Sequence, residues 1–291
     1  MSAGYRIMSI EMLPISIEPG DDELLAVPKK SAHIANVRID VVGFGEAVQE
    51  IVARAMGKSE NGYVVTPNAH HVVLLQRDAH FRRIYEDACL VVPDGVPLLW
   101  AGNLLGQKLR GRVNGTDLFE ALCAVAARQG LRVFLLGGRD HAANDAAAKL
   151  RSRNPGLQVC GTYCPDFGFE KDEIENAKII GLINEARADI LFVGLGAPKQ
   201  EYWMYANRLK LDVKVSLGIG VSFEFVAGMV PRAPVWMRST GLEWLFRLCS
   251  EPKRLWRRYI FGNAAFCGLI MRQYVEDRLD VHPTTRDRSS S

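Results

Sequence analysis

The chain of 291 residues is long enough for one large domain or for one domain with an appendage. Its 48% hydrophobic and 24% charged residues are ordinary for a globular protein and argue against a mainly disordered chain. The formal net charge of +3 is too small to indicate a nucleic-acid-binding protein by itself.

Six cysteines are present without a C-x-x-C pair, and four of them lie in apolar runs, so we expect free thiols in a reducing cytoplasm. The first ten residues lack the pattern of a signal peptide. The longest apolar run near the end, residues 260–271, is shorter than the roughly 20 residues that a bilayer requires. We therefore expect a chain that does not span a membrane but that can lie on one.

Predicted strands and helices alternate along most of the chain. Residues 1–34 are punctuated by prolines and charged residues, and we expect a flexible leader there. The predicted strands are residues 37–42, 62–66, 89–92, 131–136, 158–162, 189–193 and 213–217. The predicted helices are residues 46–56, 71–77, 80–88, 117–128, 142–153, 171–187 and 199–209.

This alternation predicts βαβ crossovers and a mostly parallel sheet with helices on both faces, spanning residues 35–230. The strand at 131–136 is apolar throughout, which favours burial on both faces. The alternation stops near Val230, where a helical, basic and aromatic segment begins. We expect residues 231–291 to form an appendage and tail.

Ligands bind outside the carboxyl ends of the strands in such sheets. Four predicted strand ends carry polar or glycine-rich residues, namely Thr66-Pro67-Asn68, Pro93-Asp94-Gly95, Gly137-Gly138-Arg139 and Gly194-Leu-Gly196-Ala-Pro-Lys199-Gln200-Glu201.

The turn at Gly194 and Gly196 can bind an anion, because glycine lets the backbone approach a diphosphate and the next helix begins there. Glycines also make tight turns, so either glycine pair alone is weak evidence. Lys199 stands where the third glycine of G-x-G-x-x-G would fall, which argues against a dinucleotide-binding fold.

Asp94 follows an apolar strand and precedes Gly95. A carboxylate in this position can take a proton from an attacking hydroxyl group. A helix cap or turn is the alternative, since Pro-Asp-Gly is a good turn sequence, and position alone does not decide.

The sequence gives no indication of a metal or another cofactor. Neighbouring histidines such as His70 and His71 point in different directions on a helix, and no Asp-x-Asp occurs that would hold a divalent ion on a diphosphate. We therefore expect arginine or lysine to neutralise any phosphate charge.

The segment 232–258 supplies that charge, with seven basic residues, two acidic residues and three of the five tryptophans. Guanidinium groups bind phosphate, and tryptophan with basic residues favours an anionic membrane surface. Arg247, Arg254 and Arg258 share a face if one helix runs through Pro252. A solvated basic helix packed on the core is the alternative, whereas the modest net charge disfavours nucleic acid.

Several separated motifs in this order resemble the TagA/CpsF/WecG family of bacterial glycosyltransferases. The resemblance covers about residues 37–259. Its motifs are Thr66-Pro-Asn68, Pro93-Asp94-Gly95, Arg112-Val-Asn114-Gly-Thr-Asp117, Phe134-Leu-Leu-Gly137-Gly138, Gly194-x-Gly196-x-Pro-Lys199-Gln200-Glu201, Arg232-Ala-Pro, and Gly241-Leu-Glu-Trp-Leu-Phe-Arg247 running into Glu251-Pro-Lys-Arg254-Leu-Trp-Arg257.

The resemblance implies a Rossmann-like core with a C-terminal helical appendage that associates with the membrane. It implies inverting, metal-independent transfer from a UDP-sugar to a sugar on a polyprenyl diphosphate, in the synthesis of a cell-surface polysaccharide such as an exopolysaccharide. The protein would lie on the inner face of the cytoplasmic membrane. A homo-oligomer is compatible with the sequence.

The resemblance also implies roles for single residues. Asp94 would be the general base, Thr66 and Gln200 would line the site, and Arg247, Arg254 and Arg257 would close over it. The same motifs supply the other candidate substrate-binding residues, which are Asn68, Arg112, Asn114, Asp117, Gly137, Gly138, Gly194, Gly196, Lys199, Glu201 and Arg232.

Two other functions remain open. The alternating pattern and glycine turns fit an NAD(P)-dependent oxidoreductase, although the incomplete fingerprint argues against it. In a non-catalytic, membrane-associated scaffold protein, Asp94, Gln200 and the arginines would be structural. The sugar also stays open between N-acetylmannosamine, its uronic acid, glucose and galactose.

Overall fold

The computed structural model describes residues 30–280, without the side chains of residues 239, 254, 255, 257–259 and 280. Most of the expected leader, residues 1–29, and residues 281–291 of the expected tail lie outside this part. The last residues of the expected leader, Ser31–Ile34, form strand β1, which pairs with β2 (Val37–Asp40) in an antiparallel hairpin.

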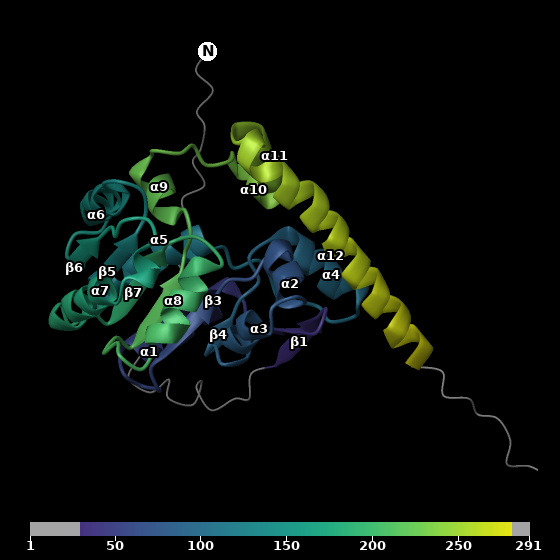
Figure 1. Cartoon of the computed structure of the whole chain (residues 1–291), viewed down its shortest axis with the longest axis horizontal. Coiled ribbons are helices and arrows are strands. Elements are labelled where there is room, and N and C mark those ends of the chain that lie inside the picture. Colours follow the sequence, from purple (N-terminus) through teal and green to yellow (C-terminus); the bar gives the residue numbers. More distant parts are fainter. Residues whose placement is uncertain (1–29, 281–291) are drawn as a thin grey trace, which may run out of the picture.

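Six parallel strands form the central sheet in the order β4-β3-β8-β7-β5-β6 (Figure 1). These strands are β3 (Gly62–Val65), β4 (Leu90–Val91), β5 (Arg132–Gly137), β6 (Gln158–Tyr163), β7 (Ile190–Gly194) and β8 (Val215–Gly218). The predicted parallel sheet is confirmed for six of the seven predicted strands, whereas the predicted strand at 37–42 forms β2 of the separate hairpin. Because the strands are parallel, their carboxyl ends share one edge.

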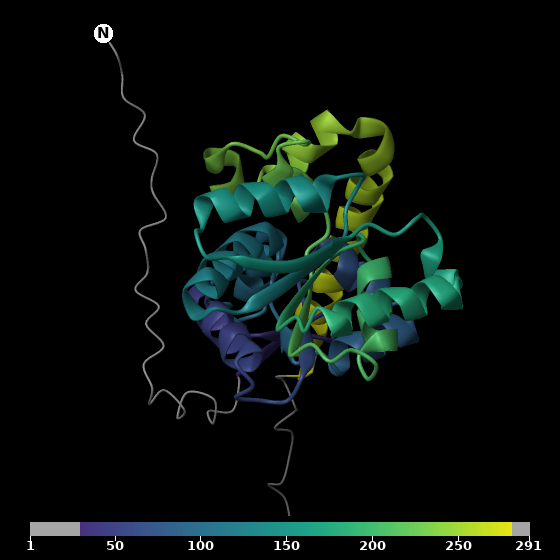
Figure 2. The same cartoon turned by 90° about the vertical axis from the view of Figure 1, so that its left-hand side faces the viewer.

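Helices cover both faces of the sheet, as predicted (Figure 2). One face packs against α1 (Phe44–Ala55), α5 (Gly115–Gln129), α6 (Ala142–Arg153) and α9 (Ser222–Ala227). The other packs against α2 (Ala69–Leu75), α3 (Ala79–Glu86), α4 (Val96–Leu104), α7 (Glu173–Glu185) and α8 (Lys199–Asn207).

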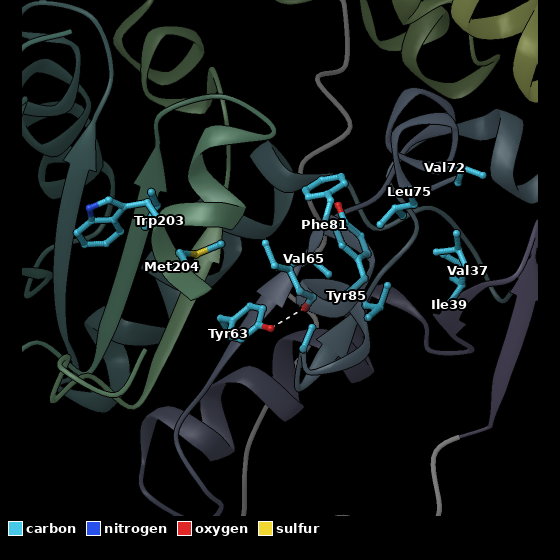
Figure 3. Close-up of a cluster of buried hydrophobic side chains, with 14 of the residues drawn as sticks. Val37, Ile39, Tyr63, Val65, Val72, Leu75, Phe81, Tyr85, Trp203 and Met204 are labelled. Atoms are coloured by element: carbon cyan, nitrogen blue, oxygen red, sulfur yellow. Dashed lines mark hydrogen bonds between the residues drawn. The ribbon is translucent and has the colours of Figure 1, made fainter. Parts of the chain in front are cut away.

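Strands β5 and β7 are almost entirely apolar because their side chains alternate between two cores. On β5, Val133 and Leu135 belong to the core under α5, whereas Phe134 and Leu136 belong to the core on the opposite face. Figure 3 shows part of the core that contains Phe134 and Leu136, where the Tyr63 hydroxyl donates a hydrogen bond to the Ile84 carbonyl at 2.5 Å.

Four helices begin after an Asn or Asp side chain that accepts backbone N–H bonds of the first turn. These caps leave fewer unpaired donors at each helix start and fix where the helix begins. The four residues are Asn68 before α2, Asp78 before α3, Asn114 before α5 and Asp172 before α7.

Beyond the sheet the chain forms α10 (Val235–Ser239), α11 (Glu243–Ser250) and α12 (Pro252–Asp280). The condition for Arg247, Arg254 and Arg258 to share one helix face is not met, since α11 ends at Ser250 and α12 begins at Pro252. Proline has no backbone N–H to donate inside a helix but is well suited to its first turn.

Helix α12 has 29 residues and runs along α2 (Figure 1). Phe266 and Ile270 on its inner face are buried in the same core as α2. The Gln273 side chain accepts a hydrogen bond from the Ala35 N–H at 2.6 Å and donates one to the His33 carbonyl at 3.0 Å. The β1–β2 hairpin thus holds the far half of α12. Within residues 30–280, no helix is both long and apolar enough to cross a bilayer.

Replacing Gln273 with alanine should lower the free energy of unfolding by about 1–2 kcal/mol, because two hydrogen bonds to the hairpin are lost and its backbone groups lose their partner. Chemical denaturation measures the change. The matched control is Gln129→Ala, an exposed glutamine at the end of α5. Equal stability of the two variants would contradict the role given to Gln273.

Candidate active site

Asp94 lies at the carboxyl edge of the sheet, directly after β4. Its backbone N–H donates to the Pro67 carbonyl at 2.8 Å, which ties it to the loop after β3. The N–H of Val113 donates to the Pro93 carbonyl at 2.9 Å, so the segment that leads into α5 is fixed to the same loop. Neighbouring strand ends therefore bring the motifs around Asp94 and Asn114 together.

Asn114 holds the Asp94 carboxylate in place. Its amide nitrogen donates to Asp94 Oδ1 at 2.9 Å. Its amide oxygen accepts the backbone N–H groups of Thr116 and Asp117 at 3.0 and 3.3 Å and a guanidinium N–H of Arg232 at 2.9 Å. Since three donors face the oxygen, the NH₂ group must face Asp94.

The protein environment moves the titration of Asp94 toward neutral pH. The side chain is half-buried, and burial raises the pKa of its carboxyl to about 6. Nearby Glu243 also raises this pKa, whereas Arg112, the Asn114 hydrogen bond and Arg247 lower it. A carboxylate with a pKa just below neutral is ionised at pH 7 and is still basic enough to accept a proton.

Three arginines converge on one carboxylate beside Asp94. Arg232, Arg238 and Arg112 approach the Asp117 carboxylate to 2.7, 3.6 and 3.8 Å. Arg112 also pairs with Glu243 at 3.2 Å. Arg232 also lies 4.0 Å from Glu120. The three guanidinium groups are mostly buried, with side chains 16–25% exposed. Guanidinium groups bind phosphate through paired hydrogen bonds, so this cluster is suited to a phosphate group.

The C-terminal segment contributes directly to this cluster. Arg232, Arg238 and Glu243 come from residues after β8, and Arg247 is close enough to lower the pKa of Asp94. Arg238 and Glu243 were not among the expected site residues, although Arg238 belongs to the basic segment. Arg254 and Arg257 lie on α12, but their side chains are outside the described part of the chain.

Gln200 and Thr66 both reach the carboxyl end of β8. The Gln200 side chain is 3% exposed; its oxygen accepts the Gly220 N–H at 2.9 Å and its nitrogen donates to Glu201 at 2.9 Å. The Thr66 hydroxyl donates to the Gly218 carbonyl at 3.4 Å. These two expected site residues, which follow β3 and β7, thus lie on either side of the carboxyl end of β8.

The two expected glycine turns pack against each other. The Gly138 N–H donates to the Gly194 carbonyl at 2.8 Å, and Gly137 has φ +99°, where an added Cβ would lie 2.7 Å from the Gly194 oxygen. Glycine is required there by the close approach of two backbones. Around Gly196 and Gly220, by contrast, an added Cβ would meet nothing within 4 Å, so the backbone borders open space.

Two expected site residues have structural partners away from Asp94. Lys199 pairs with Glu170 at 3.1 Å and lies over the Phe167 ring at 4.4 Å from its centroid. The Asn68 side chain caps α2, although its Cβ lies only 3.8 Å from the Cβ position of Gly95.

Comparison with known proteins places the chain in a family. The model of the glycosyl transferase WecG/TagA/CpsF family matches residues 32–279. An N-acetylglucosaminyldiphosphoundecaprenol N-acetyl-β-D-mannosaminyltransferase of Bacillus spizizenii is 29% identical over 213 residues, which cover 73% of this chain and 80% of the relative.

A Bacillus subtilis protein of the same name is 32% identical over 184 residues, covering 63% of this chain and 69% of the relative. The match extends through the core and the C-terminal helices that together build the cluster around Asp94. The resemblance carried by the sequence motifs is therefore confirmed, and the chain belongs to the WecG/TagA/CpsF family of glycosyltransferases.

Proposed function

We propose that this glycosyltransferase moves a sugar from a UDP-sugar to a sugar carried on a polyprenyl diphosphate, with inversion and without a metal ion. The observation that carries the proposal is the Asp94 carboxylate, oriented by Asn114 beside a cluster of guanidinium groups. Both Bacillus relatives are named for an acceptor of this class, and for N-acetylmannosamine as the transferred sugar.

In the proposed reaction, Asp94 takes the proton from the acceptor hydroxyl group as its oxygen attacks the anomeric carbon. The bond to the nucleotide diphosphate breaks on the opposite side, so a single displacement inverts the configuration. Negative charge grows on the departing diphosphate. Fixed guanidinium groups of Arg112 and Arg232 would stabilise that charge, as a divalent cation does in other enzymes.

Other residues take their proposed roles from their positions and motifs. Thr66 and Gln200 lie at strand ends where the transferred sugar would sit. Arg247 is near Asp94 and would contact the diphosphate. For Arg254 and Arg257, the proposal rests on the family motif alone.

The C-terminal helices would bring the site to the inner face of the cytoplasmic membrane, where the lipid-linked acceptor lies. Large apolar side chains are exposed on α10 and on the first turns of α12, with Trp236 60%, Ile260 57% and Phe261 63% exposed. Aromatic and apolar residues beside basic ones favour the interface of an anionic bilayer.

Replacing Asp94 with asparagine should reduce turnover by about 10²–10⁴-fold, since the amide cannot accept the hydroxyl proton. The assay follows UDP release with UDP-sugars, N-acetylmannosamine first, and a short-chain polyprenyl-diphosphate sugar. Asp145→Asn, at an exposed position on α6, is the matched control. Near-normal turnover by Asp94→Asn would refute the proposed base.

The pH profile of kcat/KM should rise through about pH 6, because Asp94 must be deprotonated to act as a base. In Glu243→Gln this acid limb should move to lower pH, since the negative charge that raises the pKa of Asp94 is removed. Glu185→Gln, with the same charge change at an exposed position on α7, should leave the limb in place. If the acid limb stayed in place in Glu243→Gln, the limb would not report the ionisation of Asp94.

The double replacement Ile260→Ser and Phe261→Ser should weaken binding to anionic vesicles at least about tenfold, because two exposed apolar side chains would no longer enter the interface. Vesicle sedimentation measures the change. Ile174→Ala, which removes an even more exposed apolar side chain from α7, is the control. Unchanged binding of the double variant would argue against this membrane-facing surface.

A further inference from the structure

Glu201 is a buried carboxylate that directly follows the expected site residue Gln200 on α8. It is 0% exposed, so a ligand at the edge of the sheet cannot contact it directly. A buried carboxylate costs more free energy than an apolar side chain of similar volume, so its presence points to a group that it orients. In this position Glu201 can act on a ligand only through its neighbours.

The Gln200 amide is held from three sides. Its nitrogen donates to Glu201 Oε1 at 2.9 Å, and its oxygen accepts the Gly220 N–H at 2.9 Å. Gly218 forms the third side, because an added Cβ there would lie 2.6 Å from the Gln200 nitrogen. A carboxylate only accepts and a backbone N–H only donates, so the amide oxygen and nitrogen cannot exchange places.

The amide lies where a ligand can reach it. Gly220, which donates to Gln200, borders open space, since an added Cβ there would meet nothing within 4 Å. Thr66, another expected site residue, reaches the same place through its hydrogen bond to the Gly218 carbonyl. The bond to Glu201 uses one of the two N–H groups of the amide. The other N–H can donate to an oxygen atom of a ligand.

Glu201 belongs to a buried polar cluster beneath the site. His71 on α2 and Tyr85 on α3 are each 3% exposed, and the Tyr85 hydroxyl lies 3.2 Å from His71 Nδ1. Burial, and after it the charge of Glu201, raises the pKa of Tyr85, which places the carboxylate close to this pair. Three helices thus enclose Glu201, and close packing of this kind leaves a side chain little freedom to move.

We propose that Glu201 is a positioning residue that fixes the Gln200 amide, with one N–H directed at the substrate, before the substrate binds. This inference rests on the proposed function, in which Gln200 lies where the transferred sugar would sit. A glutamine has several side-chain torsions and an amide that can turn over, and binding would otherwise cost that freedom. Glu201 removes the cost in advance and holds the donor in the orientation that the reaction needs.

A double-mutant cycle tests whether Glu201 acts through Gln200. Glu201→Met keeps a similar volume and removes the acceptor, and in the UDP-release assay it should lower kcat/KM about tenfold, mainly through kcat. In the Gln200→Ala background the same replacement should change kcat/KM less than about twofold, because no amide remains to be positioned. Glu201→Gln keeps an acceptor oxygen and should retain most of the activity.

Asn207→Ala is the matched control, since it removes another buried polar side chain from α8, whose amide donates to the Trp203 carbonyl at 2.9 Å. It should lower stability and change kcat/KM by the same factor in both backgrounds. Equal losses from Glu201→Met in both backgrounds would overturn the proposal and leave the role of Gln200 intact. Full turnover by Gln200→Ala would refute the proposed role of Gln200 itself, and the inference with it.

Nuclear magnetic resonance of the Gln200 side-chain amide tests the hydrogen bond without substrate. The pair of resonances is assigned by its absence in Gln200→Ala. In Glu201→Gln a neutral acceptor replaces the carboxylate, and the bonded proton should move upfield, since bonds to charged acceptors are shorter and stronger. Asn207→Ala should leave the pair in place. A pair that does not move in Glu201→Gln would overturn the proposal even if Glu201→Met does not fold.

Discussion

The side chain of Asn114 is the constraint on which the rest of the site depends. One amide group caps α5, holds the Asp94 carboxylate and receives Arg232 from the C-terminal segment. The amide cannot rotate to improve one of these bonds without losing the others. The position of the carboxylate, the start of a core helix and the docking of the segment after β8 are thus coupled through a few atoms.

Asp117 extends this coupling by electrostatics. Arg232 and Arg238 reach it from the C-terminal segment, and Arg112 reaches it from the core. Glu243, also from the C-terminal segment, pairs with Arg112, and its negative charge raises the pKa of Asp94. The core alone would therefore present a different charge and a different basicity at Asp94 from the core with α10 and α11 in place.

The sequence predicts the sheet well because strands such as β5 and β7 are apolar on both faces. Asn68 and Asn114 were expected to be site residues and not helix caps, so the predicted helices begin two residues late, at 71 and 117. Helix α4 was not predicted, since its residues Val96–Leu104 are apolar nearly all round and show no helical periodicity. Strand-end motifs predict the place of Asp94 and Gln200. The pairing of Arg238 and Glu243 with core residues depends on tertiary docking, which no local pattern records.

The surroundings of Glu224, on α9 near the end of β5, could not be predicted from the sequence either. Helix α9 was not among the predicted helices, and only the approach of the Arg139 backbone reveals that one carboxylate oxygen of Glu224 is paired and the other is not. The break at Pro252, in contrast, is visible in the sequence because proline favours the first turn of a helix. The helix start at Pro252 follows from the local sequence. Which buried polar atoms lack a hydrogen-bond partner can be determined only from the folded structure.

The hydrogen bond from Ala35 to Gln273 joins residues 238 positions apart, almost the whole described length of the chain. Closing so long a loop carries an entropic cost that is repaid only when both ends are already ordered. During synthesis the hairpin leaves the ribosome long before α12 exists. The core can therefore assemble first, and the far half of α12 is fixed to the hairpin only after its own residues have been synthesised.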